Sequence, residues 1–205
     1  LRANTATANT AVGYNALLLN STGTDNVAVG YEALDAQTTG GYNTAIGRSA
    51  LSANTTGTKN VAVGGYALLA HTTGNQNVAV GYNALLANTT AANNVAVGFE
   101  ALHTISTTGN CVAIGVSALS LNVTAENTAV GAYALDANTS GGANVAVGSG
   151  ALGANVGGAY NVAIGNGSQD AATGASNNVS MGYNSLSGSS GNNNTAVGHQ
   201  CMKSS

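Results

Sequence analysis

The chain has 205 residues, of which 44% are hydrophobic and only 5% are charged, and its formal net charge is −3. Charged residues make up about 25% of ordinary domains, so this surface must be built largely from Asn, Thr, Ser and Gly. The four basic residues, Arg2, Arg48, Lys59 and Lys203, are scattered along the chain. They form no basic patch, which argues against binding to nucleic acid or to an anionic membrane.

No apolar run approaches the roughly 20 residues of a membrane-spanning helix, so we expect no membrane insertion. The opening segment LRANTATANT does not have the pattern of a signal peptide, and we interpret the chain as a fragment of a longer protein. Low net charge and regularly placed Val and Ile argue against disorder.

Glycines that follow Val, Ile or Met recur at a nearly constant interval through the whole chain. The interval is 17 residues, except for two of 16, and the glycines are Gly13, Gly30, Gly47, Gly64, Gly81, Gly98, Gly115, Gly131, Gly148, Gly165, Gly182 and Gly198. Twelve units of this kind indicate one repeat domain over residues 1–205.

Other positions are fixed relative to that glycine. Asn stands four residues before it in every unit except one, where Cys111 replaces it, and Ala-Leu commonly stands three and four residues after it. We expect the Asn to bond turn backbone and the Gly to permit a close approach, so both columns form structural ladders. The clearest members are Asn26, Gly30, Asn43, Gly47, Asn60, Gly64, Asn77, Gly81, Asn94 and Gly98.

The repeat length predicts an all-β fold. Helical solenoids need roughly 30 to 45 residues per repeat, whereas NVAVG alternates β-branched and small residues with the period of a strand. We therefore predict a parallel β-solenoid or β-roll of about twelve 17-residue coils, each with two short strands and two turns. At about 4.8 Å per coil the rod would be roughly 55 Å long.

The alternation within NVAVG also predicts which residues face the core. We expect the β-branched residues to be buried and the small face, lined by Ala11, Gly13, Ala28 and Gly30, to be open. A neighbouring chain could then approach this small face closely, so the sequence favours a multi-chain assembly with the seam on Ala and Gly.

The motifs NVAVG, NVAIG and NTAVG, each with a following Ala, resemble the head repeats of trimeric autotransporter adhesins. The longer unit NTAVGYNALLLNSTGTDNVAVGYEAL is similar to repeat arrays of bacteriophage tail-fibre proteins. The adhesin repeats are shorter, which favours the tail-fibre interpretation.

The resemblance implies a homotrimer in a virion tail fibre or on an extracellular cell surface. It also implies a fibre shaft that contributes to host attachment, with other fibre or tail proteins and a host-cell surface glycan or protein as partners. A bacterial trimeric autotransporter-type adhesin is the alternative, and an ice-binding β-solenoid is a second one.

Two polar columns are candidate receptor-binding ladders, which we expect to be exposed. They contain Asn20, Asn54, Asn88, Asn122 and Asn138, and beside them Thr38, Thr55, Thr72 and Thr89. A flat array of Asn and Thr could bind a repetitive partner such as a polysaccharide or ice. The other interpretation is that these residues only form turns, as their conformational preferences favour.

We expect no catalytic site, no metal site and no cofactor. The histidines His71, His103 and His199 occupy three different columns, so the repeat geometry does not bring them together. Glu32 and Glu100 share a column but lie several coils apart, as do Asp35 and Asp136. These carboxylates fit a soluble surface better than an enzyme or metal centre.

Cys111 and Cys201 lie five repeats apart, about 24 Å at 4.8 Å per coil. A disulfide needs Cα atoms within about 7 Å, so the predicted fold excludes an intrachain bridge and leaves free thiols or interchain pairing open.

Aromatic residues recur directly after the glycine, at Tyr14, Tyr31, Tyr82, Phe99 and Tyr183, where they could stack on sugars or pack over the turn. The repeat columns degenerate after about residue 165, where Ser168, Gln169 and Ser185 replace Ala or Leu. This change suggests a cap, a junction or a functional tip.

Overall fold

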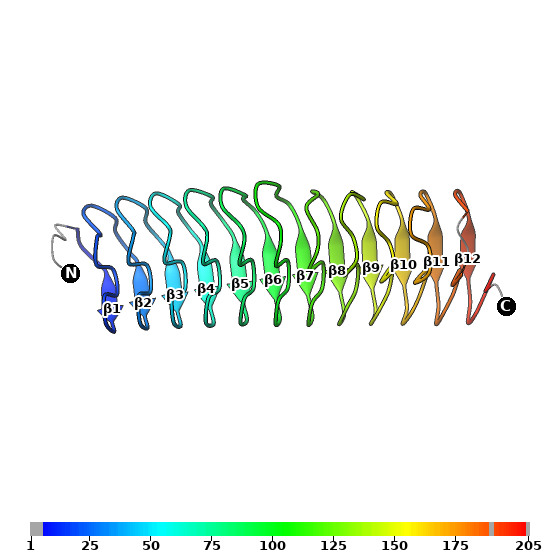
Figure 1. Cartoon of the computed structure of the whole chain (residues 1–205), viewed down its shortest axis with the longest axis horizontal. Helices are drawn as coiled ribbons and strands as arrows, with labels where there is room; N and C mark the ends of the chain where they lie inside the picture. Colours follow the sequence, from blue (N-terminus) through cyan, green and yellow to red (C-terminus); the bar gives the residue numbers. More distant parts are fainter. Residues whose placement is uncertain (1–5, 189–190, 204–205) are drawn as a thin grey trace.

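The computed structural model describes residues 6–188 and 191–203. They form a rod in which three-residue strands lie side by side in chain order, every neighbouring pair parallel (Figure 1). The predicted all-β parallel solenoid with 17-residue coils is confirmed. Its strands are β1 (Thr10–Val12), β2 (Val27–Val29), β3 (Thr44–Ile46), β4 (Val61–Val63), β5 (Val78–Val80), β6 (Val95–Val97), β7 (Val112–Ile114), β8 (Thr128–Val130), β9 (Val145–Val147), β10 (Val162–Ile164), β11 (Val179–Met181) and β12 (Thr195–Val197).

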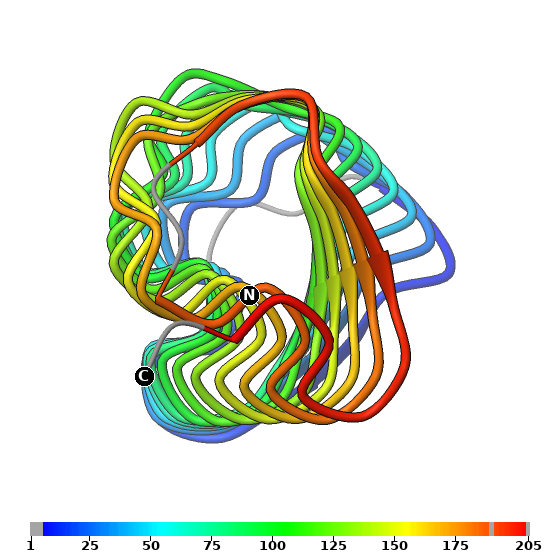
Figure 2. The ribbon, with the colours of Figure 1, turned by 90° about the vertical axis from the view of Figure 1, so that its right-hand side faces the viewer.

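Strand register is the same along the whole rod. Each residue pairs with its equivalent one coil later, as Ala28 does with Ala45. The two 16-residue coils keep this register, because Val112 pairs with Thr128 and Val179 with Thr195. The missing residue is therefore taken from the turns. Viewed along the rod, successive coils overlay with a gradual rotation (Figure 2).

Each coil has one strand among the described residues, so the prediction of two strands per coil is wrong. The segment after the glycine contains two residues in the left-handed region, such as Glu32 at φ 54° and Leu34 at φ 51°. Left-handed residues at every second position are incompatible with the extended backbone of a strand. Backbone bonds still join the coils here, for example from Leu34 N to the Ala50 carbonyl at 3.1 Å.

Leu and Ala fill the interior, and the β-branched residues point outward. Ala28 at the centre of β2 and Leu34 in the following turn are fully buried, whereas Val27 and Val29 are half-exposed. The expectation of buried β-branched residues is therefore wrong. The narrow coil is already filled by one Leu, two Ala and amide side chains, which leaves no volume for two more branched residues.

The predicted seam on Ala11, Gly13, Ala28 and Gly30 is wrong for the same reason. Ala28 faces the core, and a Cβ built on Gly13 or Gly30 would overlap the glycine carbonyl of the next coil of the same chain. The small residues thus serve contacts between coils within one chain. Any contact between chains must use another face.

Two polar ladders run through the rod beside this core. In the column four residues before the glycine, Asn60 Nδ2 donates to the Gly74 carbonyl at 3.0 Å and to Asn43 Oδ1 at 3.2 Å. Asn60 Oδ1 in turn accepts from Asn77 N at 3.0 Å. Each Asn thus satisfies the backbone of a turn and links two coils, as buried amides require.

Candidate functional site

The column seven residues after the glycine is internal, contrary to the expectation of an exposed receptor-binding ladder. The side chains are turned inward, and several of their amides bond the carbonyl three residues later, as from Asn138 Nδ2 to Gly141 at 2.8 Å. A partner in solution cannot touch them. Full burial holds for all five Asn predicted there, which are Asn20, Asn54, Asn88, Asn122 and Asn138.

Neighbouring members of this column also bond one another. Asn138 Nδ2 donates to Asn122 Oδ1 at 2.7 Å, and Asn54 Nδ2 donates to Gln37 Oε1. Ile105 occupies the same column and is fully buried. An Ile in a column of amides was the sequence signal that the column faces the core, because an exposed polar array would not carry it.

His71 is the titratable member of the same column. Its side chain is fully buried, with Nε2 at 2.8 Å from the Gly74 carbonyl and Nδ1 at 3.3 Å from the Asn88 side-chain amide. Burial lowers the pKa of His71, and its hydrogen bonds to Gly74 and Asn88 only oppose that shift. The imidazole is therefore held neutral at physiological pH and acts as a ladder residue.

The four Thr side chains predicted beside that ladder are half-buried. Their hydroxyls donate along the rod to the next coil, as from Thr38 Oγ1 to the Thr55 carbonyl and from Thr72 Oγ1 to the Thr89 carbonyl, both at 3.0 Å. Thr55 and Thr89 bond in the same way. These hydroxyl protons are used inside the protein, so Thr38, Thr55, Thr72 and Thr89 do not present a free array.

The outer strand face is a regular and mainly apolar surface of the rod. We define it as the first and third residues of β1 to β12, which are Val, Thr, Ile or Met in every strand. They are half-exposed or exposed. The exposed fraction of the residue is 40% for Ile46 and Ile114 and 43% for Met181. No charged side chain interrupts this face.

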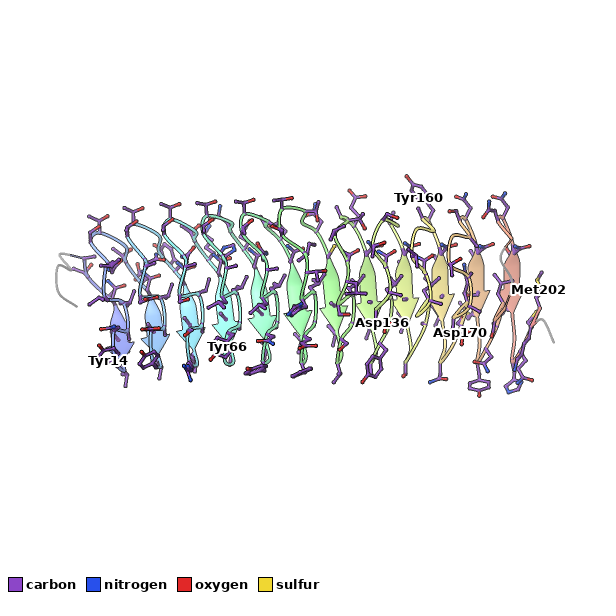
Figure 3. The ribbon with its side chains drawn as sticks, in the orientation of Figure 1. Tyr14, Tyr66, Asp136, Tyr160, Asp170 and Met202 are labelled. Atoms are coloured by element: carbon purple, nitrogen blue, oxygen red, sulfur yellow. The ribbon has the colours of Figure 1, made fainter. Side chains whose placement is uncertain are left out.

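An aromatic row follows one edge of the rod over the first six coils. We define it as Tyr14, Tyr31, Tyr66, Tyr82 and Phe99; Figure 3 shows Tyr14 and Tyr66 at the same lower edge. Tyr14 stacks on Tyr31 with ring centroids 5.3 Å apart, and Tyr82 stacks on Phe99 at 6.0 Å. Tyr14, Tyr31, Tyr82 and Phe99 are all exposed. The rings thus pack on each other and still present their rims to solvent.

Arg48 lies within this row. Its guanidinium carbon is 5.6 Å from the Tyr31 ring centroid and 5.8 Å from the Tyr66 ring centroid, which places the cation between two rings. Both distances fall in the range of cation–π contacts. A third stacked pair, Tyr183 on His199 with ring centroids 5.3 Å apart, lies near the far end of the rod.

The other titratable groups are dispersed. Within the described residues there is no group of three or more His, Cys, Asp and Glu side chains placed to hold a metal ion, and no pocket. Cys111 and Cys201 are both free, and burial raises the pKa of the Cys111 thiol. No helix capable of crossing a membrane occurs in the described parts of the chain.

The polar residues predicted to mark a cap, junction or tip after residue 165 lie in the core. Ser168, Gln169 and Ser185 are fully buried, and Ser168 Oγ bonds Ser180 Oγ at 2.7 Å. Gln169 Oε1 has no partner. The solenoid continues past them to β12, with a core that is less apolar than that of the preceding coils.

Comparison of the chain with models of protein families, with curated proteins and with solved structures finds no match.

Proposed function

We propose that the chain is a structural segment of an extracellular fibre, in the first place the shaft of a bacteriophage tail fibre that contributes to host attachment. The outer strand face is the observation that carries this proposal. Parallel sheets in proteins usually have both faces covered, yet this sheet covers only its inner face within one chain.

The size of the outer strand face supports burial between chains. Twelve strands about 4.8 Å apart make a strip about 53 Å long, and a width of about 12 Å gives roughly 600 Å². That is the upper end of the roughly 300–600 Å² patches exposed by monomeric proteins. It also approaches the roughly 800 Å² that one partner contributes to a standard interface.

The occupant of this face is another copy of the same chain. An uncharged strip of Val, Thr and Ile with a constant spacing is complementary to an identical strip in the same register, and the resemblance to tail-fibre repeats sets the number of chains at three. The fibre then acts as a stiff spacer with other fibre or tail proteins at its ends. Repetition on three chains multiplies weak contacts with a host-cell surface glycan or protein.

Charge substitution on the outer strand face tests the assembly. Val63→Lys and Val80→Lys, together, place two buried cations per chain in the interface at mid-rod, which should convert the trimer to monomers with an unchanged β-sheet circular dichroism spectrum. Thr56→Lys adds a charge at an exposed turn and should leave the trimer intact. If the double variant sediments like the wild-type trimer, this face is not the interface.

A further inference from the structure

Arg48 is a cation held by aromatic contacts and not by an ion pair. Its side chain is exposed, and no carboxylate among the described residues forms an ion pair with it. The rings of Tyr31 and Tyr66 hold the guanidinium from two sides. An arginine that is ordered by its neighbours before a ligand arrives loses less conformational entropy on binding.

The hydrogen-bond donors of Arg48 are accessible from solvent, because its side chain is exposed. A guanidinium is planar and carries its N–H groups in that plane. Contacts with the rings of Tyr31 and Tyr66 do not supply an oxygen acceptor for these donors, which leaves them for an external one. The geometry that matches such a fork is a carboxylate bound through two parallel hydrogen bonds.

The next coil has no side chain at the position equivalent to Arg48, and the Tyr82 ring packs over that position. Gly65 occupies the equivalent position, and a Cβ built there would lie 3.3 Å from the Tyr82 ring. Tyr66 meets Tyr82 edge-on at 5.5 Å. Arg48 is thus flanked by a position without a side chain and by Tyr rims that offer both apolar edges and hydroxyls, the mixture that a sugar ring can contact.

The charge near Arg48 limits the ligand to one with sparse negative charge. Glu32, on the preceding coil, lies close enough to raise the pKa of Tyr31 through a hydrogen bond and its charge. No other cation lies in the aromatic row. A dense polyanion such as nucleic acid needs several phosphate contacts and would meet Glu32 as well.

We propose that Arg48, with Tyr31 and Tyr66, binds the carboxylate of an acidic sugar in a host-surface glycan. This inference rests on the proposed attachment function and specifies the partner for one edge of the fibre. One such site per chain gives several identical weak sites per fibre, so an extended glycan with repeated acidic sugars gains affinity by simultaneous contacts.

The test is isothermal titration of the assembled wild-type protein with a hexamer of galacturonic acid. We expect binding to the acid hexamer and at least about tenfold weaker binding to its fully methyl-esterified form, because a hydrogen bond to a charged group contributes about 1.5–3 kcal/mol. Glucose 6-phosphate serves as the phosphate probe. Binding to it as strong as to monomeric galacturonic acid would show a general anion site and overturn the assignment to carboxylates.

Matched charge variants locate the site. Arg48→Gln should weaken binding at least about tenfold, and Tyr66→Ala should weaken it through loss of one flanking ring. Lys59→Gln is the control, because it removes the same charge from an exposed position in the neighbouring coil. Lys59 belongs to the same repeat column as Tyr160, which Figure 3 shows at the edge of the rod opposite to Tyr14 and Tyr66. Lys59→Gln should leave affinity unchanged. Equal losses in Arg48→Gln and Lys59→Gln would mean that only net charge matters, and no loss in Arg48→Gln would overturn the proposal.

Molar mass, measured on the same samples, separates this inference from the proposed assembly. Arg48→Gln should form the same assembly as wild type, so loss of binding with intact assembly supports the site. A wild-type trimer that does not bind the acid hexamer would overturn the glycan inference alone. A monomer that binds it through Arg48 would overturn the assembly and keep the site.

Discussion

Asn43 Oδ1 accepts hydrogen bonds from both the backbone N–H and the side-chain Nδ2 of Asn60, at 2.9 and 3.2 Å, although the two residues lie in different coils. The same pair of contacts recurs between Asn60 and Asn77. The ladder therefore replaces, inside the rod, the water that would otherwise solvate the turns. Its integrity should be measurable one residue at a time.

Asn60→Ala should lower the free energy of unfolding by about 2–4 kcal/mol, because it removes the acceptor of the Asn77 backbone N–H and one of the two side-chain partners of the Gly74 carbonyl. Thr56→Ala, at an exposed position in the same coil, should change it by no more than about 0.5 kcal/mol. Equilibrium unfolding in guanidinium chloride measures both. Equal, small effects would show that the ladder contributes little.

Glycine is required at the repeat position for two reasons that act together. Gly81 has φ 142°, and a Cβ built on it would overlap the carbonyl oxygen of Gly98. Gly81→Ala should therefore destabilise the rod by about 2–4 kcal/mol through strain and displacement of a coil.

Gly174→Ala is the matched control for that substitution. No atom lies within 4 Å of a Cβ built on Gly174. This variant should be neutral or slightly stabilising, since Ala restricts the unfolded chain more than Gly does. Thermal unfolding of both variants compares them, and similar melting temperatures would contradict the coil-contact role of the repeat glycine.

His71 should make the stability of the rod depend on pH. Burial lowers its pKa in the folded state, so below about pH 6.5 the unfolded chain binds more protons than the folded one. The free energy of unfolding should be level above that pH and fall as the pH decreases from about 6.5, by at most about 1.4 kcal/mol per pH unit.

His71→Asn is the variant that tests this dependence, because Asn is the usual residue of the column. It should abolish the loss of stability between pH 7 and pH 5. His103→Asn changes a half-buried histidine in a different coil. This variant should still lose stability between pH 7 and pH 5. A wild-type stability that does not change over this range would show that His71 is not held neutral by the fold.

The polar core after residue 165 should be a weak section of the solenoid. Gln169 is buried in the column that Leu152 and Leu186 otherwise occupy, with φ 53° as in the Leu positions, and its Oε1 has no partner. Gln169→Leu should stabilise this section by about 1–2 kcal/mol. Slower amide hydrogen exchange in β10 and β11 would show it; faster exchange would mean that the bond from Gln169 to Asn161 Oδ1 matters more.

The period and its fixed columns predict the fold because a repeat must satisfy the same backbone groups in every coil. The direction in which the strand faces point was not predictable from alternation alone, since Val-Ala-Val has the same period whichever face is inside. Thr10 and Thr44 in the place of Val were a usable signal, because a buried column rarely exchanges Val for Thr.

The candidate site was predicted less well than the fold. Asn and Thr were assigned to the surface by residue type, yet in a coil without large side chains the turns need internal amides to satisfy their carbonyls. The sequence predicted only part of the aromatic row around Arg48. Tyr66 stands two residues after its repeat glycine and not one, so its contact with Arg48 could not be predicted from a shared column.

The molar mass of the wild-type segment in solution, measured by light scattering at several concentrations, tests the central claim most directly. The exposed outer strand face predicts a mass near three times 19.8 kDa that persists on dilution. A mass of 19.8 kDa at all concentrations would show that one chain is stable with this face in water, and would contradict the proposed fibre assembly.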